Sequence, residues 1–546
     1  CLIVGKGQAA LAASIAMKSK LRVILCVKKD KDVGKLRETL VEAGLYGNKV
    51  VVHTLDSLDA LPYAENIFNL LLDPENTLGK EETLRVLRPK DGIAFKGHRL
   101  EKALTKAPVQ GAGEWTHLYA EPGNTACSRD QRVAASLSLQ WFGRPGPERL
   151  VDRHHRSVSP LYKNGFLFIP GNERIFGVDG YNGTVLWETE IPDSLRIAIM
   201  RDCGSMAVDD DFIYVASGSN CLALEVGTGR VDVRYTIPDE AMANTHEWGY
   251  VARAERLLIG SAVEKGGIRR QHGHDGIRET YWDNRPPVCS DLLYAMNLES
   301  GKAKWTYRPS GGGTIVNSSL AIDDGLIHFV ESPIKSEKGR LAYGKIFEGG
   351  NAGLVTLDLK TRKPVLRRQL PRKSGVQNLY VIATKGIVTV VNSRNDKTVR
   401  YDVRAYEASN GKLLWEQTQD NRLKINGSHG EQDRHPVVMN DELYVEPMIY
   451  NLRTGLPVER QLKRGRGCGA LSASANALYF RSDNPTAYLP ATGKFSKITS
   501  VSRPGCWINA IPAGGMLLIP EASSGCTCAF PIQCSLAFAP KESSKK

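Results

Sequence analysis

The chain has 546 residues, 42% of them hydrophobic and 24% charged, which excludes a disordered or collagen-like protein and indicates a globular one. No apolar run reaches the roughly 18 residues of a membrane-spanning helix, so no transmembrane helix is predicted. The formal net charge is +13, but the basic residues are dispersed, without the stripe of cations and aromatics that nucleic-acid binding favours. An acidic polysaccharide or an anionic membrane surface remains compatible with this charge.

Residues 1–110 alternate apolar, strand-like runs with helix-like segments. The run from Cys1 leads into a glycine turn at Gly5 and Gly7, then into a helix and a second strand. Strands that alternate with helices predict a parallel sheet with both faces covered, as in a small α/β domain. Because Cys1 falls inside the first strand and no Met precedes it, we expect a fragment or processed product whose upstream part is missing.

The order of these elements, with the phrase LRVLRPKDG from Leu84, resembles class I S-adenosylmethionine-dependent methyltransferases across nearly the whole segment. The resemblance implies a Rossmann-like domain that binds S-adenosylmethionine. In such a site Gly5 and Gly7 line the cofactor, Asp56 lies near the adenine and Asp73 faces the substrate.

The end of the second strand departs from that pattern. A nucleotide-type ligand needs a carboxylate there to hold the ribose hydroxyls. Lys28 occupies this place, and Asp30 could substitute only if the strand end shifted by two residues. The glycine turn also lacks a third glycine, so we predict a degenerate domain, with a working cofactor site as the alternative.

A repeated phrase dominates residues 111–540. It consists of a short apolar strand, a turn of the type Asp-x-x-x-Gly and a second strand that often carries Trp. The clearest copy spans residues 175–188, and six more begin at Cys221, Leu292, Leu354, Val403, Met448 and Ala487. Units of roughly 40–50 residues with four alternating strands are typical of β-propeller blades. No unit has the helical period that a helical solenoid requires.

Seven copies and an incomplete last unit predict an all-β propeller of eight blades over residues 111–540, with seven blades as the alternative. The last unit, residues 506–540, supplies only three strands. We expect the missing outer strand at residues 138–143, ahead of the first blade, because pairing the two ends of the ring removes an exposed sheet edge. Residues 541–546 form a basic tail.

The repeated phrase resembles the pyrroloquinoline-quinone (PQQ) type of repeat in quinoprotein dehydrogenases and bacterial outer-membrane assembly lipoproteins. A closer resemblance is to large bacterial proteins in which such a propeller follows a methyltransferase-like domain. It rests on GEWTHLYAEPGNTA from Gly113, SHGEQDRHP from Ser428, RGCGALSAS from Arg466 and RPGCWINAIPAGG from Arg503. The dehydrogenases use adjacent paired cysteines, calcium and an Asp base. This chain has no Cys-Cys pair, so we expect no PQQ, and we interpret the repeat tryptophans as blade packing.

The connections into the innermost strands converge on the mouth of a propeller's channel, a preferred place for ligands. The residues predicted to line this funnel are His155, Arg201, His246, Glu247, His429, Glu431, His435, Arg466, Arg503 and Trp507. The same connections carry Arg156, Asn378 and Asp433. Loops that are polar only because they line water are the alternative interpretation.

Within the funnel, His429, Glu431 and His435 form a set that could hold zinc or iron, although hydrogen bonding between blades is the favoured interpretation. The 11 cysteines favour an oxidising compartment with one or two disulfides, and buried thiols are the alternative. Cys468 and Cys506 occupy equivalent places in neighbouring blades and could form a disulfide.

Together these features predict a periplasmic or otherwise extracytoplasmic propeller that binds a small molecule, a carbohydrate or a protein partner at its channel mouth. It could belong to a larger polypeptide or complex. The enzymatic alternatives are a methyltransferase at Gly5–Gly7 and a funnel with redox or polysaccharide-active chemistry. In such a funnel His429, His435 and Arg201 would act as acid–base or oxyanion groups.

Overall fold

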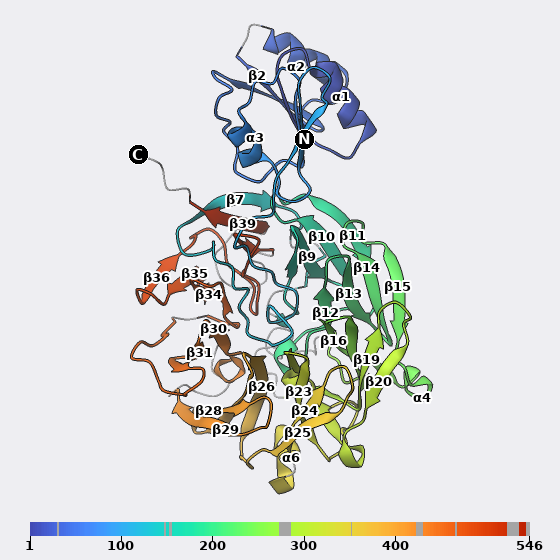
Figure 1. Ribbon diagram of the computed structural model, residues 1–546, viewed down its shortest axis with the longest axis vertical. Coiled ribbons are helices and arrows are strands. Elements are labelled where there is room, and N and C mark those ends of the chain that lie inside the picture. Colours follow the sequence, from blue (N-terminus) through green and yellow to red (C-terminus); the bar gives the residue numbers. More distant parts are fainter. Residues whose placement is uncertain are drawn as a thin grey trace. The chain divides into compact units, whose positions relative to one another are not determined.

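The computed structural model describes residues 1–29, 32–146, 149–151, 155–271, 285–350, 352–421, 430–464, 467–520 and 534–541. The chain divides into two compact units, Cys1–Gln110 and Gly111–Lys546. Figure 1 shows helices and a twisted sheet in the first unit and a ring of small sheets in the second. Among the residues described, no helix is long and apolar enough to cross a membrane.

The N-terminal unit is built on one six-stranded sheet in the order β3-β2-β1-β4-β5-β6. Its strands are β1 (Leu2–Val4), β2 (Val23–Lys28), β3 (Val50–Leu55), β4 (Leu70–Asp73), β5 (Ile93–Lys96) and β6 (Lys102–Thr105). The first five strands are parallel, and β6 pairs antiparallel with β5. The helices are α1 (Ala9–Lys18), α2 (Val33–Glu42) and α3 (Lys80–Val86).

Alternate residues of these strands enter two separate apolar clusters. Ile3 and Leu25 pack with Ala12 and Ala16 of α1. Their neighbours along the strands face the other way, and that second cluster contains Leu2, Val4, Cys26, Leu71 and Val86. Both faces of the sheet are therefore buried, which explains why the strands are almost continuously apolar.

The second unit contains eight sheets arranged around a ring, which confirms the eight-bladed prediction over the seven-bladed alternative (Figure 1). Blade 1 holds β8 (Leu161–Lys163), β9 (Phe166–Gly171), β10 (Arg174–Asp179) and β11 (Val185–Glu190). Blade 2 holds β12 (Met206–Val208), β13 (Phe212–Ser217), β14 (Asn220–Glu225) and β15 (Val231–Thr236). Blade 3 holds β16 (His246–Ala254), β17 (Leu257–Glu264), β19 (Leu292–Asn297) and β20 (Ala303–Tyr307).

Blade 4 holds β18 (Cys289–Ser290), β21 (Thr314–Val316), β22 (Ala321–Asp323), β23 (Leu326–Ser332), β24 (Gly353–Asp358) and β25 (Pro364–Gln369). Blade 5 holds β26 (Val376–Thr384), β27 (Ile387–Asp396), β28 (Thr398–Glu407) and β29 (Leu413–Asp420). Blade 6 has three strands, β30 (Val437–Met439), β31 (Glu442–Val445) and β32 (Met448–Asn451). Its expected fourth strand is reduced to a single bridge between Tyr450 and Pro457, since proline has no N–H for a ladder.

Blade 7 holds β33 (Ser472–Ala473), β34 (Leu478–Ser482), β35 (Asn484–Leu489) and β36 (Lys494–Lys497). Blade 8 combines β37 (Ile511–Ala513), β38 (Met516–Ile519) and β39 (Ser535–Pro540) with β7 (Leu137–Gly143). Strand β7 pairs antiparallel with β39, so the two ends of the propeller sequence meet in one sheet. The predicted ring closure is confirmed.

The repeat tryptophans of blades 1, 3 and 5 join each of these blades to the next one, in agreement with the predicted blade packing. The indole Nε1 atoms of Trp187, Trp305 and Trp415 donate hydrogen bonds of 2.9, 2.7 and 2.9 Å to carbonyl oxygens in the following blade. The ring of Trp187 lies against Gly229, where an added Cβ would fall 2.3 Å from it. The turn glycine is therefore required both by its φ of 68° and by the neighbouring indole.

One segment without regular structure crosses the centre of the ring, and we call residues 113–130 the hub segment (Figure 1). It makes backbone hydrogen bonds to the inner strands of seven blades, at Tyr162, Val208, Ile322, Ala383, Val438, Ala473 and Gly514. In the remaining blade, the amide of Arg253 donates to His117 Nε2 (3.0 Å). The hub segment therefore pairs inner-strand amides that would otherwise face the channel without partners.

The hub segment contacts the inner strands near their C-terminal ends. The side chain of Asn124 joins two blades: its amide nitrogen donates to the carbonyl of Leu320 in blade 4 (2.8 Å) and of Val381 in blade 5 (3.1 Å). Asn124 has a φ of 63°, in the left-handed region that asparagine tolerates better than most residues. The channel is thus closed on this side by the chain itself.

The predicted disulfide between Cys468 and Cys506 is wrong. No disulfide joins these or any other cysteines within the described residues. The Cys506 sulfur instead accepts a hydrogen bond from Arg481 Nη1 at 3.2 Å. Cys221 and Cys289 lie in apolar clusters, and burial raises the pKa of the Cys289 thiol to about 12, so it behaves as a small apolar side chain.

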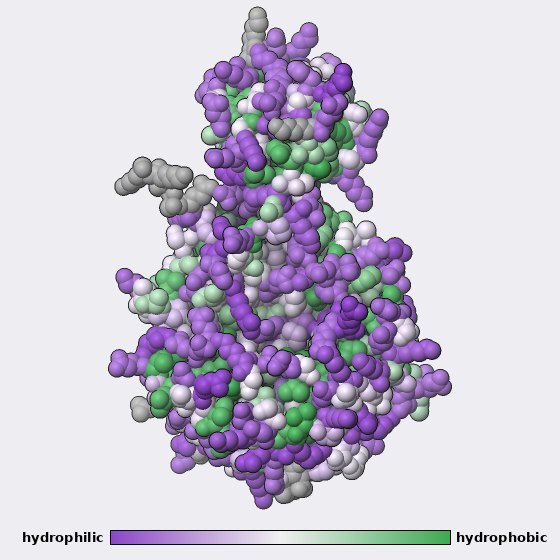
Figure 2. Space-filling view, viewed as in Figure 1, coloured by the Kyte–Doolittle hydropathy of each residue, from purple (hydrophilic) through white to green (hydrophobic). Residues whose placement is uncertain are grey.

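Exposed apolar side chains are scattered over the blades. Figure 2 shows a visible face of the propeller that is mostly hydrophilic, with apolar residues in small separate groups. The most exposed large ones in the propeller, Phe142, Leu456 and Val501, come from three different blades or connections. No extended apolar surface is formed by the residues described on this face.

Candidate functional site

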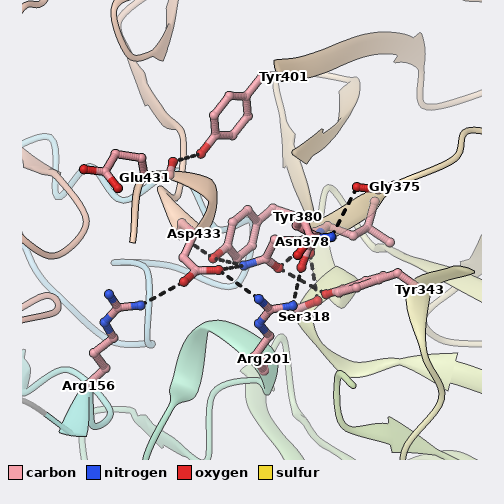
Figure 3. A network of polar contacts seen from close by, with 12 residues as sticks. Arg156, Arg201, Ser318, Tyr343, Gly375, Asn378, Tyr380, Tyr401, Glu431 and Asp433 are labelled. Carbon is pink, nitrogen blue, oxygen red and sulfur yellow. Dashed lines mark hydrogen bonds and ion pairs between the residues drawn. The ribbon is translucent and has the colours of Figure 1, made fainter. Parts of the chain in front are cut away.

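The connections into the inner strands meet on the axis of the ring in a buried polar network (Figure 3). Arg156 precedes β8, Arg201 precedes β12, Asn378 lies in β26 and Asp433 precedes β30. These four residues belong to blades 1, 2, 5 and 6, and we call them the axial network. They lie at the end of the channel opposite the hub-segment contacts, since they stand where inner strands begin.

Asp433 is the centre of the axial network. Its carboxylate accepts hydrogen bonds from Arg156 Nη1 at 2.9 Å, Arg201 Nη2 at 3.3 Å and Asn378 Nδ2 at 3.2 Å. Arg156 and Asp433 are each only 1% exposed. Burial acts to lower the pKa of Arg156, but the charge and hydrogen bond of Asp433, together with the nearby Cys468 and Cys506 sulfurs, hold that pKa above its usual value. Arg156 therefore stays charged inside the protein.

Two tyrosines complete the hydrogen bonding around Asp433 (Figure 3). The Tyr380 hydroxyl donates to the Asp433 backbone carbonyl at 2.7 Å and accepts from Asn378 Nδ2 at 2.9 Å. The Tyr343 hydroxyl donates to Asn378 Oδ1 at 3.1 Å. A buried network of this kind is stable only when its members satisfy one another, so each residue depends on the rest.

The hub segment reaches the same network through Tyr119. The ring of Tyr119 stacks on His435 with centroids 3.6 Å apart and planes 12° apart. His435 also meets the edge of Tyr380 at 4.7 Å. Burial lowers the pKa of His435 to about 3, so the imidazole is neutral at physiological pH.

A second buried carboxylate repeats the arrangement in blade 6. Glu446 forms ion pairs with Arg434 Nη1 at 3.0 Å and Arg464 Nε at 2.7 Å. Burial lowers the pKa of Arg464 to about 10, which still leaves the guanidinium charged near neutral pH. As at Asp433, one carboxylate is shared by two arginines.

Asp202 joins the second blade to the fourth. Its carboxylate lies 3.4 Å from Arg196 Nη1 and accepts a hydrogen bond of 3.2 Å from Asn317 Nδ2. All three residues are nearly inaccessible to solvent. The charged side chains near the axis therefore contact one another across blade boundaries.

The structure brings several of the predicted funnel residues to this region. Arg201 binds Asp433, Arg156 lies 5.9 Å from the Trp507 ring, and Glu431 belongs to the same 3-10 turn as Asp433. Arg503 is fully buried, with its Nη2 4.0 Å from the Cys506 sulfur. Several of the predicted connections thus meet at Asp433, to which the prediction assigned no role, and the binding role of the predicted residues stays a prediction.

Other predicted funnel residues contact partners outside the axial network. His246 Nε2 lies 3.2 Å from Asp291, and Glu247 pairs with Arg270 at 2.6 Å. His155 directly precedes Arg156, and its backbone carbonyl accepts a hydrogen bond from the amide of Ala198. His429 and Arg466 lie outside the described residues.

The metal site predicted from His429, Glu431 and His435 stays a prediction, because His429 is not among the residues described. Within the part of the chain that the structure covers, no three His, Cys, Asp or Glu side chains gather as metal ligands would. The ring of His435 lies flat on Tyr119, and the Glu431 carbonyl accepts a hydrogen bond from the Tyr401 hydroxyl (2.7 Å).

Asp73 of the N-terminal unit, expected to face a substrate, is instead fully buried. Its Oδ1 accepts from the Thr77 amide (2.9 Å), its Oδ2 accepts from the Leu78 amide (3.0 Å), and Lys96 Nζ lies 3.4 Å away. These contacts fix the loop that follows β4. The carboxylate therefore serves the loop's own structure.

The glycine turn of this unit is occupied by another acidic residue. The amide of Lys6 donates to Glu75 Oε1 at 3.2 Å, and a Cβ on Gly5 would fall 3.0 Å from the Glu75 carboxyl carbon. Gly7 has open space around it, Asp56 is exposed after β3, and Asp30 lies outside the described residues. Glu75 thus takes the backbone donor that a ligand of this turn would use.

Sequence reasoning missed the hub segment and Tyr119. The signal was present, because the motif from Gly113 lies before the first blade and belongs to no repeat. Most of its contacts with the blades are single backbone hydrogen bonds, which leave no side-chain pattern in the sequence to recognise.

Comparison with known proteins finds no matching family model and no matching curated protein. Among solved structures, quinohemoprotein alcohol dehydrogenase from Comamonas testosteroni is similar, with 13% identity over 78% of this chain and 80% of that one, at a TM-score of 0.51. BamB from Moraxella catarrhalis (14% identity, 63% and 82% coverage, TM-score 0.34) and the dihydro-heme d1 dehydrogenase NirN (11%, 65% and 66%, 0.37) also match. The first match confirms the likeness in fold to quinoprotein propellers.

Proposed function

We propose that this chain is a binding protein whose propeller is a rigid scaffold and whose channel mouth holds a polar ligand or a partner's loop. The observation that carries the proposal is the axial network. Asp433 is shared by Arg156 and Arg201, so these charges already serve one another and fix four blades around the axis. A preorganised framework of this kind suits recognition, because little freedom is lost when a ligand binds.

The buried groups do not suit acid–base chemistry. A general acid or base works best with a pKa near the operating pH and with access to the substrate. His435 has its pKa lowered to about 3 by burial and is covered by Tyr119. Arg201 is held by Asp433. This favours binding over the funnel enzyme that uses His435 and Arg201.

The ligand would contact partly exposed residues on the mouth side of the axial network. Gln377 and His155 are half-buried and adjoin Asn378 and Arg156 directly in sequence. The Gln377 carbonyl accepts a hydrogen bond from Arg201 Nη1, which ties this residue to the network. His429 and Arg466 belong to the same set of connections and would complete the proposed surface, whereas the buried Arg503 and Trp507 would support it. The extracytoplasmic location stays a prediction.

A thermal-shift screen tests the binding proposal. The purified chain is heated with neutral oligosaccharides, acidic oligosaccharides and short peptides, each far above the expected dissociation constant. A ligand at a hundred times its Kd stabilises the folded state by about 2.7 kcal/mol, which is a measurable shift. The account predicts at least one shift that is lost in Gln377→Ala or His155→Ala.

The control is Lys412→Ala, an exposed residue on the rim of blade 5, which should retain the shift. A ligand whose shift survives both mouth substitutions would contradict the proposed surface. Conversion of a ligand to a new product would favour the enzymatic alternative.

For the N-terminal unit, we infer a degenerate relative of the methyltransferase-like domain. The parallel order β3-β2-β1-β4-β5 supports the relationship, since Rossmann-like sheets share it. Glu75 in the glycine turn and the buried Asp73 support the loss of the cofactor site. Calorimetry of S-adenosylmethionine with the full chain should give no heat of binding, and sub-millimolar binding would contradict the inference.

A further inference from the structure

A basic groove runs along the outer strand of blade 3. One hollow of about 730 Å³ lies between this strand and the turn before β25, and its charged lining residues are Glu255, Arg256, Lys302, Lys304 and Lys360. A second hollow of about 410 Å³ adjoins the end of β20, and it is lined by Thr306, Tyr307, Arg308, Arg362 and Pro364. We call these two hollows the basic groove.

Cations outnumber carboxylates in the basic groove by six to one among these lining residues. Lys360 pairs with Glu255 at 3.3 Å, and Arg308 pairs with Asp239. The other four cations, Arg256, Lys302, Lys304 and Arg362, have no carboxylate within ion-pair distance in the described part of the chain. An exposed groove lined by one sign of charge attracts ligands of the opposite sign.

Arg362 breaks the protein's own repeat at this groove. The other six copies of the repeated phrase carry glycine in the same turn position, and Arg362 keeps the left-handed backbone with a φ of 62°. A non-glycine residue there costs roughly 1–2 kcal/mol. Its Nη1 donates to the Thr306 carbonyl at 2.9 Å, which places the guanidinium across the groove beside β20. Retained backbone strain of this kind clusters at functional sites.

We propose that the basic groove binds an acidic polysaccharide through its carboxylate or sulfate groups. The four cations without a carboxylate partner are Lys304 on β20, Lys302 just before it, Arg256 in the turn ahead of β17 and Arg362 in the turn of the next blade. Their spread along both hollows suits a chain that carries several anions. Arginine recognises carboxylate and sulfate oxygens in a bidentate manner. This proposal concerns the rim and does not depend on the channel mouth.

The groove lacks the stacking rings that recognition of a single-stranded nucleic acid uses. Its only aromatic lining residue is Tyr307, whose hydroxyl donates to Glu331 at 2.5 Å and whose ring packs on Phe329 with centroids 5.4 Å apart. Base recognition on single strands depends on aromatic rings that are free to stack. An acidic sugar polymer can be held through its anionic groups without such stacking.

The repeat supplies a matched control for charge. Lys302 follows turn glycine Gly301, and Lys412 and Lys494 follow the equivalent Gly411 and Gly493 in blades 5 and 7. All three lysines are exposed. The double variant Lys302→Glu/Lys304→Glu therefore changes the net charge by the same amount as Lys412→Glu/Lys494→Glu, but only the first alters the groove.

Binding is measured on the full chain with immobilised heparin as the sulfated probe, polygalacturonate as the carboxylated probe and dextran as the neutral one. The groove variant should bind the better acidic probe at least about tenfold more weakly, while the control variant changes affinity less than about twofold. Arg362→Gly should weaken binding severalfold without disturbing the fold, because it restores the residue used by the other blades. Which acidic probe binds tells sulfate from carboxylate recognition.

Four results would overturn the proposal. The first is that neither acidic probe binds at physiological salt. The second is that the control variant loses as much affinity as the groove variant. Equal affinity for a single-stranded oligothymidylate would show a general polyanion surface instead of a polysaccharide site. Loss of binding in Gln377→Ala with the groove variant unaffected would move the ligand to the channel mouth.

Discussion

The axial network and the basic groove use the same kinds of residue in opposite ways. In the network, Arg156 and Arg201 are buried and share the carboxylate of Asp433. In the groove, Lys302 and Lys304 are exposed and have no carboxylate within ion-pair distance among the described residues. Burial decides which charges hold the protein together and which ones remain available to a ligand.

The physical reason lies in solvation. A buried ion that loses its partner keeps its desolvation penalty, so breaking a buried pair is strongly destabilising. An exposed ion is already hydrated, and its removal changes stability little. The comparison therefore predicts large stability effects on the axis and binding effects on the rim. All eight tryptophans lie beyond residue 110, so tryptophan fluorescence reports on unfolding of the propeller alone.

The largest effect is expected from Asp433→Ala. Two buried guanidiniums lose their carboxylate, so the free energy of unfolding in urea should fall by about 3–5 kcal/mol. The matched control is Asp441→Ala in the same blade, whose pair with Lys385 is 77% exposed on the aspartate side and should change stability by less than about 1 kcal/mol. Equal losses in the two variants would remove the distinction between axis and surface.

Removal of the Asn124 side chain should have the next largest effect. Asn124→Gly keeps the left-handed backbone but deletes the hydrogen bonds to Leu320 and Val381, and about 1–3 kcal/mol of stability should be lost. Asn164→Gly is the control, because Asn164 also has a positive φ but bonds Asp210 at the surface. A loss no greater than in the control would mean that the hub segment does not hold blades 4 and 5 together.

The pH dependence of stability reports on His435. Its pKa is about 3 in the folded state and about 6.5 when unfolded, so below pH 6.5 the unfolded state binds the additional proton. Stability is therefore lost as pH falls, by about 2 kcal/mol from this group between pH 7 and pH 5. His435→Phe keeps a ring against Tyr119 and should remove that part of the loss in urea titrations at the two pH values. An unchanged pH dependence would place His435 in contact with water.

The smallest effect is expected at the rim. Arg362→Gly removes a left-handed arginine, so the propeller should become equally stable or more stable by up to about 1 kcal/mol, even as acidic polysaccharide binding weakens. Thermal unfolding and probe affinity are measured on the same preparation. Destabilisation would mean that Arg362 serves the fold, not the groove.

The ring could be predicted from sequence because its determinants repeat. Turn glycines such as Gly229 and indoles such as Trp187 recur at one spacing, and β7 was recognisable as the strand that the last blade lacks. Blade 6 departs from the rule at Pro457, where a strand position lost its N–H. A repeated pattern allows such a fold to be predicted from sequence, whereas a single exception is seen only in the structure.

The site was predicted less completely because its partners are far apart in sequence. Arg156 and Asp433 are separated by 277 positions, and although both were placed in connections that converge on the channel, nothing in either local sequence indicates that they form an ion pair. Glu75 fills the glycine turn from a loop that pattern reasoning passed over. The hub segment escaped prediction because backbone hydrogen bonds, which any residue can make, account for most of its contacts.

Hydrogen exchange tests the central claim that the hub segment closes the channel of a rigid ring. The amides of Val208, Ile322, Ala383 and Ala473 donate to this segment. The account predicts that they exchange as slowly as Ile213 in the interior of blade 2, by unfolding of the whole propeller. Exchange within seconds at these amides, with Ile213 still protected, would show that the segment detaches and that the channel is open.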